Sequence, residues 1–304
     1  MTLFTLTTEE RNHRSMKLDQ MTTEEIVTLM NEEDQKVAQA VKEVLPRITE
    51  AVDMIYESLT NGGRMFYVGA GTSGRLGILD ASECPPTFMT EPELVQAVMA
   101  GGEKAFMSAV EQCEDEEKQG EEDIISRKIT KKDIVVGITA SGRTPYPIGA
   151  VKYAKSIGAR TIGIACNASS EIGHSVDCMI EAVVGPEVLT GSTRMKAATA
   201  QKFILNMLST ASMVKMGKVH ENLMVDVHAT NYKLQERAKK IVMDATSVSY
   251  EEASKLLEET SFRVKPAIVM TFSNSPLQKV EKALKIHNGY VREAVIALLN
   301  GEID

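Results

Sequence analysis

Short apolar runs alternate with helical patterns through the middle of the chain. Five of the runs are short enough for buried strands: residues 64–69, 94–99, 134–139, 161–165 and 178–182. Helical patterns lie between or after them, at residues 74–82, 103–119, 148–156 and 193–215. Apolar strands that alternate with helices predict an α/β fold of three layers, in which helices cover both faces of a mainly parallel sheet.

Helical patterns without strands flank this region. Thr22 and Glu25 fit a capping box that opens a first helix to about residue 30, and a second helix is expected over residues 34–60 with a kink at Pro46. Short helices follow after about residue 250: 251–260, 265–271, 276–286 and 291–299. We therefore predict three parts: an N-terminal helical segment (1–60), an α/β domain (61–245) and a small C-terminal helical domain (246–304).

A glycine-rich loop follows the first apolar run. Its sequence is Gly69-Ala70-Gly71-Thr72-Ser73-Gly74, and a helical pattern begins just after it. Such a junction presents backbone N–H groups at the positive end of a helix dipole, which together bind an anion. The loop also fits the G-x-G-x-x-G pattern of dinucleotide sites, but the nearby acids Glu91 and Glu93 precede the second strand run instead of closing it. Taken alone, the loop leaves anion binding, dinucleotide binding and a purely structural turn open.

Two more loops rich in hydroxyl groups lie at predicted strand ends or helix starts. One is Ser141-Gly142-Arg143-Thr144, and the other is Gly191-Ser192-Thr193-Arg194. In open parallel sheets, ligands bind beyond the carboxyl ends of the strands. The three loops together predict a small phosphorylated molecule as ligand. We expect its site to be lined by Thr72, Ser73, Ser141, Arg143 and Thr144, with Ser192 and Thr193 at the rim.

Two acidic features are candidates for catalysis. Glu83 ends the first crossover helix and precedes Pro85 and Pro86, which we expect to stop the helix and stiffen the chain. Glu114 belongs to an acidic run late in the next helical pattern, where like charges repel and acids oppose the helix dipole. Ordinary solvated charges are the alternative for both features.

Composition narrows the class of protein. The 304 residues carry a formal net charge of -8, which disfavours nucleic acid as a partner. The first 20 residues lack an apolar signal core, and the longest apolar pattern, at 203–217, is too short and too polar to span a membrane. The four cysteines have no CxxC spacing, which indicates reduced thiols in a cytoplasmic protein. The five histidines form no cluster typical of a metal site.

Several longer motifs, in order, resemble one enzyme family. They lie at residues 8–12, 69–88, 101–102 with 114–115, 140–146, 185–196 and 222–227. They are similar to the N-acetylmuramic acid 6-phosphate etherases, whose core, here residues 61–245, belongs to the sugar isomerase (SIS) superfamily of phosphosugar-binding domains. Three positions depart from the expected pattern, since His13 replaces a proline and both Met89 and Glu221 replace glycines.

This resemblance implies an activity and a set of site residues. The activity is cleavage of the D-lactyl ether of N-acetylmuramic acid 6-phosphate by a carbon–oxygen lyase that uses no cofactor and no metal. Glu83 matches the proton donor, a role that requires a poorly solvated surrounding, and Glu114 matches the second catalytic position, assigned as the base. The implied substrate-binding residues are Gly71, Thr72, Ser73, Gly74, Ser141, Gly142, Arg143, Thr144, Glu187, Ser192 and Thr193.

The resemblance also bears on partners and on alternative functions. Related phosphosugar domains pair, so a homodimer with sites near its interface is expected, with a phosphosugar ligand and without nucleic acid or membrane. The glucokinase regulatory proteins share the fold, which makes a non-catalytic phosphosugar sensor the main alternative, and a phosphosugar isomerase is a third. The single phosphosugar unit and the presence of Glu83 and Glu114 favour the etherase.

Overall fold

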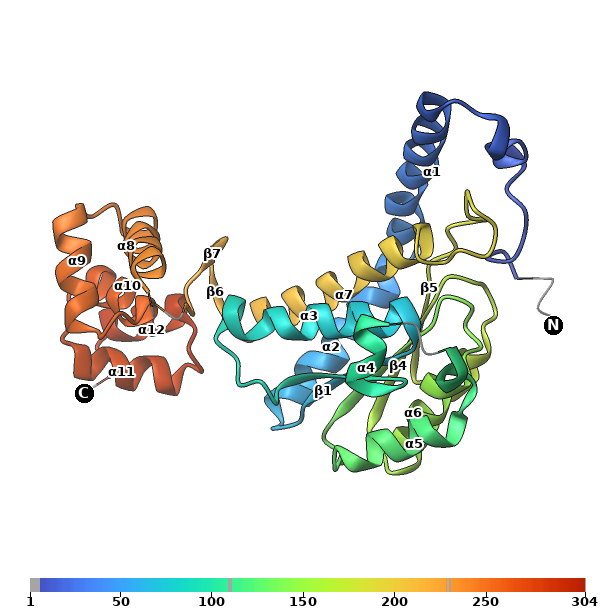
Figure 1. The fold of residues 1–304 in the computed structure, drawn as a ribbon. Helices are drawn as coiled ribbons and strands as arrows, with labels where there is room; N and C mark the ends of the chain where they lie inside the picture. Colours follow the sequence, from blue (N-terminus) through green and yellow to red (C-terminus); the bar gives the residue numbers. More distant parts are fainter. Residues whose placement is uncertain (1–5, 109–110, 228, 230, 304) are drawn as a thin grey trace. The chain divides into compact units, whose positions relative to one another are not determined.

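A five-stranded sheet is the centre of the computed structural model, which describes residues 6–108, 111–227, 229 and 231–303 (Figure 1). Its strands are parallel and lie in the order β2-β1-β3-β4-β5. All five predicted strands are confirmed: β1 (Met65–Gly69), β2 (Val95–Met99), β3 (Ile134–Ile138), β4 (Arg160–Ala165) and β5 (Cys178–Glu181). In the register, Met65 lies between Val95 and Ile134. The chain moves outward from β1 to β2 and then returns past β1 to β3, so the carboxyl ends of β1 and β3 form the switch point where such sheets bind ligands.

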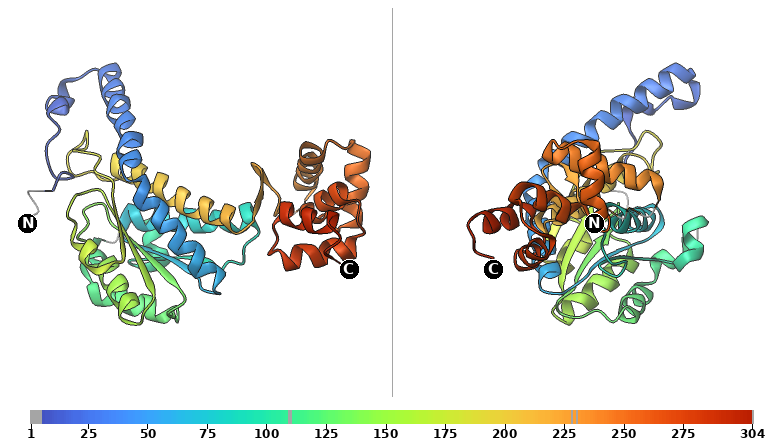
Figure 2. Two further views of the ribbon diagram at one scale, coloured as in Figure 1. Left: turned by 180° about the vertical axis from the view of Figure 1, so that it is seen from behind. Right: turned by 90° about the vertical axis from the view of Figure 1, so that its left-hand side faces the viewer.

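Helices cover both faces of this sheet, which confirms the predicted three-layer α/β fold (Figures 1 and 2). On one face lie α5 (Glu117–Ser126) and α6 (Pro145–Ser156), where Phe66 of β1 shares a buried core with Ile124 and Tyr146. Because side chains alternate along a strand, the neighbouring Tyr67 belongs to the other face.

Three helices cover that other face: α2 (Leu45–Thr60), α3 (Gly71–Phe88) and α7 (Lys196–Lys215). The Tyr67 hydroxyl donates to the Asp80 carboxylate of α3 at 2.9 Å, and the same carboxylate accepts from the Asn206 amide of α7 at 2.7 Å. This buried polar bridge fixes α3 and α7 against β1, and it therefore also fixes the loops that begin these helices.

The two predicted N-terminal helices are present, but the predicted break between them is wrong. α1 (Thr23–Glu43) opens with the capping box of Thr22 and Glu25, as predicted, and continues through residues 31–33, which include no helix breaker. The break lies at Val44 instead. Pro46 stands in the first turn of α2, where its missing N–H leaves no intrahelical bond unmade, so it starts α2 and does not kink it.

The prediction that Pro85 and Pro86 stop the first crossover helix is also wrong. α3 begins at Gly71, earlier than predicted, and runs to Phe88 with both prolines inside it. They lie in its last turn, where each ring removes one N–H donor of the helix, but the Met89 N–H still donates to the Pro85 carbonyl at 2.9 Å and the turn stays helical. The helix ends at Met89, whose φ of 52° is the left-handed conformation typical of a residue that follows a helix.

The single helix predicted over residues 103–119 is three shorter elements. They are α4 (Gly102–Met107), η4 (Glu111–Asp115) and the start of α5, while Ala109 and Val110 lie outside the described residues. α4 ends because Ser108 is extended and because Arg75 of α3 donates to the carbonyls of Ala105, Phe106 and Ser108. Glu114 therefore lies on a short 3-10 turn and not on a long helix. The described residues also form the short 3-10 turns η2 (His13–Ser15), η3 (Leu18–Gln20) and η5 (Glu171–Ser175).

Contacts divide the chain into two compact units. The sheet unit comprises residues 1–82 and 93–209, and the helical unit comprises residues 83–92 and 210–304. The helical unit holds a short hairpin, β6 (Val219–His220) with β7 (Leu223–Met224), and five helices among its described residues. Four of the helices match the prediction and α8 was not predicted: α8 (Tyr232–Thr246), α9 (Tyr250–Glu259), α10 (Val264–Ser273), α11 (Leu277–Ile286) and α12 (Val291–Leu299). The division into domains at residues 60 and 245 stays a prediction, which limited proteolysis can test.

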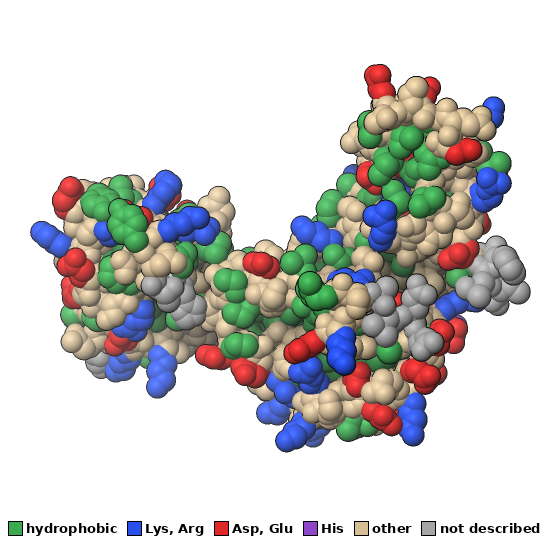
Figure 3. All heavy atoms as spheres, viewed as in Figure 1, with side chains coloured by type: hydrophobic (Ala, Val, Ile, Leu, Met, Phe, Trp, Pro, Cys, Tyr) green, Lys and Arg blue, Asp and Glu red, His purple; other side chains and the backbone are tan. Residues whose placement is uncertain are grey.

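The surface carries mixed charge. On the face drawn in Figure 3, Lys and Arg side chains are interspersed with Asp and Glu. Within the described part of the chain, every helix is too short or too polar to cross a lipid bilayer.

Candidate active site

The glycine-rich loop after β1 is shaped by close backbone contacts. A Cβ on Gly74 would lie 2.7 Å from the Gly69 carbonyl oxygen, so the turn from strand to helix requires glycine there. Gly71 has a φ of 52°, and its missing side chain leaves room for the Glu114 carboxylate, because a Cβ would lie 2.9 Å from Glu114 Oε1. Thr72 is half-buried, whereas Ser73 is buried and donates its hydroxyl to Gln201 Oε1 of α7 at 2.9 Å.

The loop after β3 is held by its own hydroxyl groups. The Gly142 N–H donates to Thr139 Oγ1 at 3.2 Å, and Thr139 Oγ1 lies 2.8 Å from Thr144 Oγ1. The Arg143 N–H donates to Ser141 Oγ at 3.2 Å. These short-range bonds fix the loop, and they leave the half-buried hydroxyls of Ser141 and Thr144 at the sheet edge.

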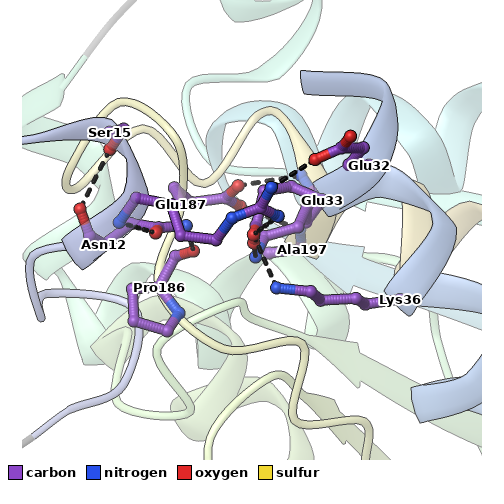
Figure 4. Close-up of polar contacts among 10 residues, drawn as sticks. Asn12, Ser15, Glu32, Glu33, Lys36, Pro186, Glu187 and Ala197 are labelled. Carbon is purple, nitrogen blue, oxygen red and sulfur yellow. Dashed lines mark hydrogen bonds and ion pairs between the residues drawn. The ribbon is translucent and has the colours of Figure 1, made fainter. Parts of the chain in front are cut away.

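The third loop, before α7, is anchored by buried charges (Figure 4). Glu187 is fully buried and accepts from the N–H groups of Lys196 and Ala197 at 3.1 and 2.9 Å, so it caps the start of α7. Burial raises the pKa of Glu187, and these N–H donors oppose part of that rise. The Lys196 side chain in turn donates to Glu33 Oε2 of α1 at 2.8 Å, and both side chains are at most 2% exposed.

The Glu33 carboxylate is also held by Arg14 and Lys36 (Figure 4). Burial alone would raise its pKa, but hydrogen bonds from Lys196 and Lys36 outweigh burial and lower the pKa to about 2. The start of α7 is therefore tied by ionised side chains to α1, at residues that sequence reasoning did not single out.

The three loops meet at one open pocket of about 300 Å³, at the carboxyl ends of β1, β2 and β3. It is lined by Glu9, Ala70, Gly71, Thr72, Ser73, Arg75, Met99, Ala100, Ala105, Glu114, Ala140, Ser141, Thr144, Gly191 and Thr193. The lining offers hydroxyls, the start of α3 and two carboxylates. Such a site can hold an anion at the helix start and carry out acid–base chemistry with its carboxylates.

Two known proteins of similar sequence carry the same name. A protein from Bacillus pumilus called "N-acetylmuramic acid 6-phosphate etherase" is 53% identical over 96% of this chain and 97% of its own length. One of the same name from Bacillus subtilis is 51% identical over 97% of both chains. The chain belongs to the family of N-acetylmuramic acid 6-phosphate etherases.

Two domain models and a solved structure are similar to parts of the chain. Residues 47–155 of this etherase family member match the description "Glucokinase regulatory protein N-terminal SIS domain", and residues 117–211 match "SIS domain". A solved phosphoheptose isomerase from Francisella tularensis is similar over 64% of this chain and all of its own, at 20% identity and a TM-score of 0.48.

The predicted site residues of this etherase family member fall into two groups. The pocket is lined by Gly71, Thr72, Ser73, Glu114, Ser141, Thr144 and Thr193. The lining does not include Gly74, Glu83, Gly142, Arg143, Glu187 or Ser192. Of these, Gly74 and Gly142 shape the backbone of their loops, and Glu187 caps α7. Whether the first group binds substrate stays a prediction.

Glu83 does not lie in a poorly solvated surrounding in the single chain. It is exposed on α3, next to the buried Cys84. The carboxyl group of a general acid is normally kept protonated by burial. An acid role for Glu83 therefore needs something else to cover it.

Two charged residues of the pocket lining were missed by sequence reasoning. Glu9 belongs to the motif at residues 8–12, which carried part of the family resemblance without a role. Arg75 directly follows the glycine-rich loop, and its guanidinium is bound to the end of α4. Over the described ranges, no group of three or more His, Cys, Asp or Glu side chains could hold a metal ion.

Proposed function

We propose that this chain cleaves the D-lactyl ether of N-acetylmuramic acid 6-phosphate and releases D-lactate and N-acetylglucosamine 6-phosphate. The observation that carries the proposal is 53% identity, over nearly the whole length of both chains, to a protein of that name. The pocket supports it, because hydroxyl groups and a carboxylate meet at the switch point of the sheet.

In this proposal the phosphate binds at the glycine-rich loop. Thr72, Ser141 and Thr144 offer hydroxyl donors there, and the start of α3 offers the positive end of its dipole. Binding energy from the phosphate fixes the reacting carbons of the sugar near the catalytic carboxylates.

The reaction begins with an elimination. The open-chain sugar has an aldehyde beside the carbon that bears the acetamido group, so the proton on that carbon is acidic. Glu114 takes this proton, and the resulting enolate expels the lactyl group from the next carbon. Glu83 lies outside the pocket lining of its own chain, so in this proposal it acts from the second copy of a dimer. There it protonates the departing ether oxygen, and D-lactate leaves an unsaturated aldehyde. Each proton transfer of this kind typically contributes about 10²–10⁴-fold in rate.

The reaction ends with the addition of water. Water adds to the carbon that carried the ether and returns a proton to Glu83, and Glu114 returns its proton to the acetamido-bearing carbon. The carboxylates regain their starting states, and the sequence needs neither a redox partner nor a metal ion.

We further propose that the chain works as a cytoplasmic homodimer. The second copy would cover Glu83 and give it the poorly solvated surrounding that a general acid needs. Sedimentation of the pure protein tests the dimer, and a monomer at micromolar concentration with full activity would contradict it.

Isotopic labels test the reaction itself. Pure protein should release D-lactate from the substrate, and turnover in heavy water should place deuterium on the acetamido-bearing carbon. Turnover in oxygen-18 water should place the label on the adjacent sugar hydroxyl. Label in the lactate hydroxyl would mean cleavage on the lactate side, and phosphosugar binding without lactate release would favour a sensor.

Substitution of Ser141 tests the phosphate site. Ser141→Ala should raise KM about 5–10-fold with little change in kcat, since a hydrogen bond to a charged group contributes about 1.5 kcal/mol or less when the ligand can also be bound by its neighbours. Ser156→Ala is the matched control, because Ser156 is exposed at the end of α6, outside the pocket lining, and its loss should change KM less than twofold. An unchanged KM for Ser141→Ala would reject the assignment.

A further inference from the structure

The N-terminal segment at residues 6–12 is anchored to the sheet edge where the pocket opens. Thr8 is fully buried, and its N–H donates to Asn167 Oδ1 at 3.3 Å, while Asn167 Nδ2 donates to Thr8 Oγ1 at 3.0 Å. Thr7 adds a hydroxyl bond to Asn167 at 2.8 Å, and Asn167 also donates to the Ala140 carbonyl at 3.0 Å. Because Asn167 follows β4 and Ala140 follows β3, the segment is bound to two strand ends.

Glu9 comes directly after this anchor and is fixed from both sides. Its N–H donates to the Leu6 carbonyl at 2.9 Å, and downstream Asn12 donates to the Pro186 carbonyl at 3.3 Å (Figure 4). The Glu9 side chain lines the pocket, and its Oε2 lies 3.6 Å from the position that a Cβ on Gly191 would take. The left-handed Gly191, with a φ of 78°, thus leaves space beside this carboxylate.

A carboxylate in this pocket has a defined electrostatic effect. Two like charges a few ångströms apart repel each other, and the repulsion is stronger in a pocket than in bulk water. Glu9 therefore disfavours a phosphate beside it, whereas it accepts hydrogen bonds from neutral donors. In a phosphosugar those donors are the sugar hydroxyls and the acetamido N–H.

We propose that Glu9 is a substrate-binding residue that accepts a hydrogen bond from a hydroxyl or acetamido N–H of the sugar. This proposal rests on the substrate class of the proposed function. It gives the N-terminal segment a role in orienting the substrate.

The affinities of two probes distinguish a substrate-binding role of Glu9 from a purely structural role. The probes are N-acetylglucosamine 6-phosphate and inorganic phosphate, with affinities measured by calorimetry on the full chain. Glu9→Gln should weaken binding of the sugar phosphate about tenfold, and Glu9→Ala should weaken it at least as much, while phosphate binding stays equal or tightens. Glu10→Gln is the matched control, since Glu10 is exposed like Glu9 but lies outside the pocket lining, and it should change neither affinity.

Equal weakening of both probes, or no weakening of the sugar phosphate, would overturn the proposal. So would an unsubstituted chain that does not bind the sugar phosphate. Failure of the proposed function would give a different result. The unsubstituted chain would then release no lactate, but Glu9→Gln would still bind the sugar phosphate more weakly than Glu10→Gln. Melting temperatures within about 2 °C of the unsubstituted chain show that a variant is folded.

Discussion

The sheet unit and the helical unit use different residues at left-handed backbone positions. Among the described residues, the sheet unit mostly places glycine at positive φ: Gly62, Gly71, Gly101, Gly102, Gly142, Gly158, Gly185 and Gly191. The helical unit mostly places other residues there: Met89, Glu221, Ser247, Ser261, Phe262, Asn274 and Asn288. A side chain in this conformation costs about 1–2 kcal/mol, with Asn the best tolerated.

The difference reflects what surrounds the pocket. Gly71 and Gly142 are confined by neighbours as well as by φ, since a Cβ would lie 2.9 Å from Glu114 Oε1 or 2.3 Å from the Ser170 Cβ. In the helical unit, Met89 and Asn274 end helices and Glu221 turns a hairpin, at places where a side chain can project outward. The sheet unit therefore uses glycine to shape the site, whereas the helical unit retains backbone strain that a substitution can remove.

The largest predicted effect is the loss of activity when Glu114, whose carboxylate lies beside Gly71, is replaced. Glu114→Ala should lower kcat by about 10²–10⁴-fold, because it removes the proposed base. It should also slow exchange of the acetamido-carbon proton with heavy water, measured by NMR. Glu83→Ala should abolish lactate release but keep the exchange. The opposite pattern would reverse the two roles, and losses below about 10²-fold in both would place the catalytic pair elsewhere.

The next prediction concerns the free energy of unfolding when a buried charged residue is replaced in each of the two units. Glu33→Gln should lower the free energy of unfolding by about 3–5 kcal/mol, since it leaves the buried Lys196 without its carboxylate. The pKa of Glu33 is lowered to about 2 from an unfolded value near 4.5, so its stabilisation is complete above that unfolded value and is lost as pH falls toward 2. Denaturant unfolding at several pH values should show the two proteins converging on acidification.

Lys265→Met is the control in the helical unit. Lys265 pairs with Asp226 at 2.8 Å, but Asp226 keeps Lys218 at 3.2 Å, so the loss should be about 1 kcal/mol. Burial lowers the pKa of Lys265 while Asp226 opposes that change, and the variant removes this costly buried charge. An equal loss of unfolding free energy in Glu33→Gln and Lys265→Met would contradict this expected difference between the two units.

The sequence predicted the elements of the sheet unit better than their ends. Strand runs such as 134–139 were recognised because a buried parallel strand is apolar throughout. Helix ends at Val44, Phe88 and Ser108 were missed. The end at Ser108 depends on a tertiary contact, since Arg75 of α3 donates to the last carbonyls of α4. Local propensity is a weak guide where such contacts decide.

The candidate site was predicted only in part, because some of its residues leave a local pattern in the sequence and others do not. Glycine and hydroxyl residues at strand ends leave a local pattern, so Thr72, Ser141 and Thr144 could be named in advance. The placement of Glu9 depends on Asn167, about 160 residues away in sequence, and nothing local indicates it. Glu187 was assigned to substrate, but the buried N–H groups at the start of α7 show its structural role as a cap.

A smaller effect tests whether pocket glycines differ from ordinary turn glycines. Gly71→Ala adds about 1–2 kcal/mol of backbone strain and also displaces Glu114, so kcat should fall about tenfold as well as stability. Gly62→Ala has a similar φ of 79° with open space around it, so it should lower stability only. Steady-state kinetics and thermal melts of both variants check this, and an unchanged kcat in Gly71→Ala would mean that Glu114 moves without consequence.

The smallest effect should be a gain of stability in the helical unit. Glu221 is the first residue of the two-residue loop between β6 and β7, and its φ of 53° fits the hairpin position at which type II′ turns prefer glycine. Glu221→Gly should therefore raise the free energy of unfolding by up to about 1 kcal/mol, since relief of strain exceeds the added entropy of the unfolded chain. Asn274→Gly is the control, because Asn tolerates this conformation and its replacement should gain little. Calorimetric melts that show no gain for Glu221→Gly would mean that the two terms cancel, and the helical unit would then carry no strain that glycine can remove.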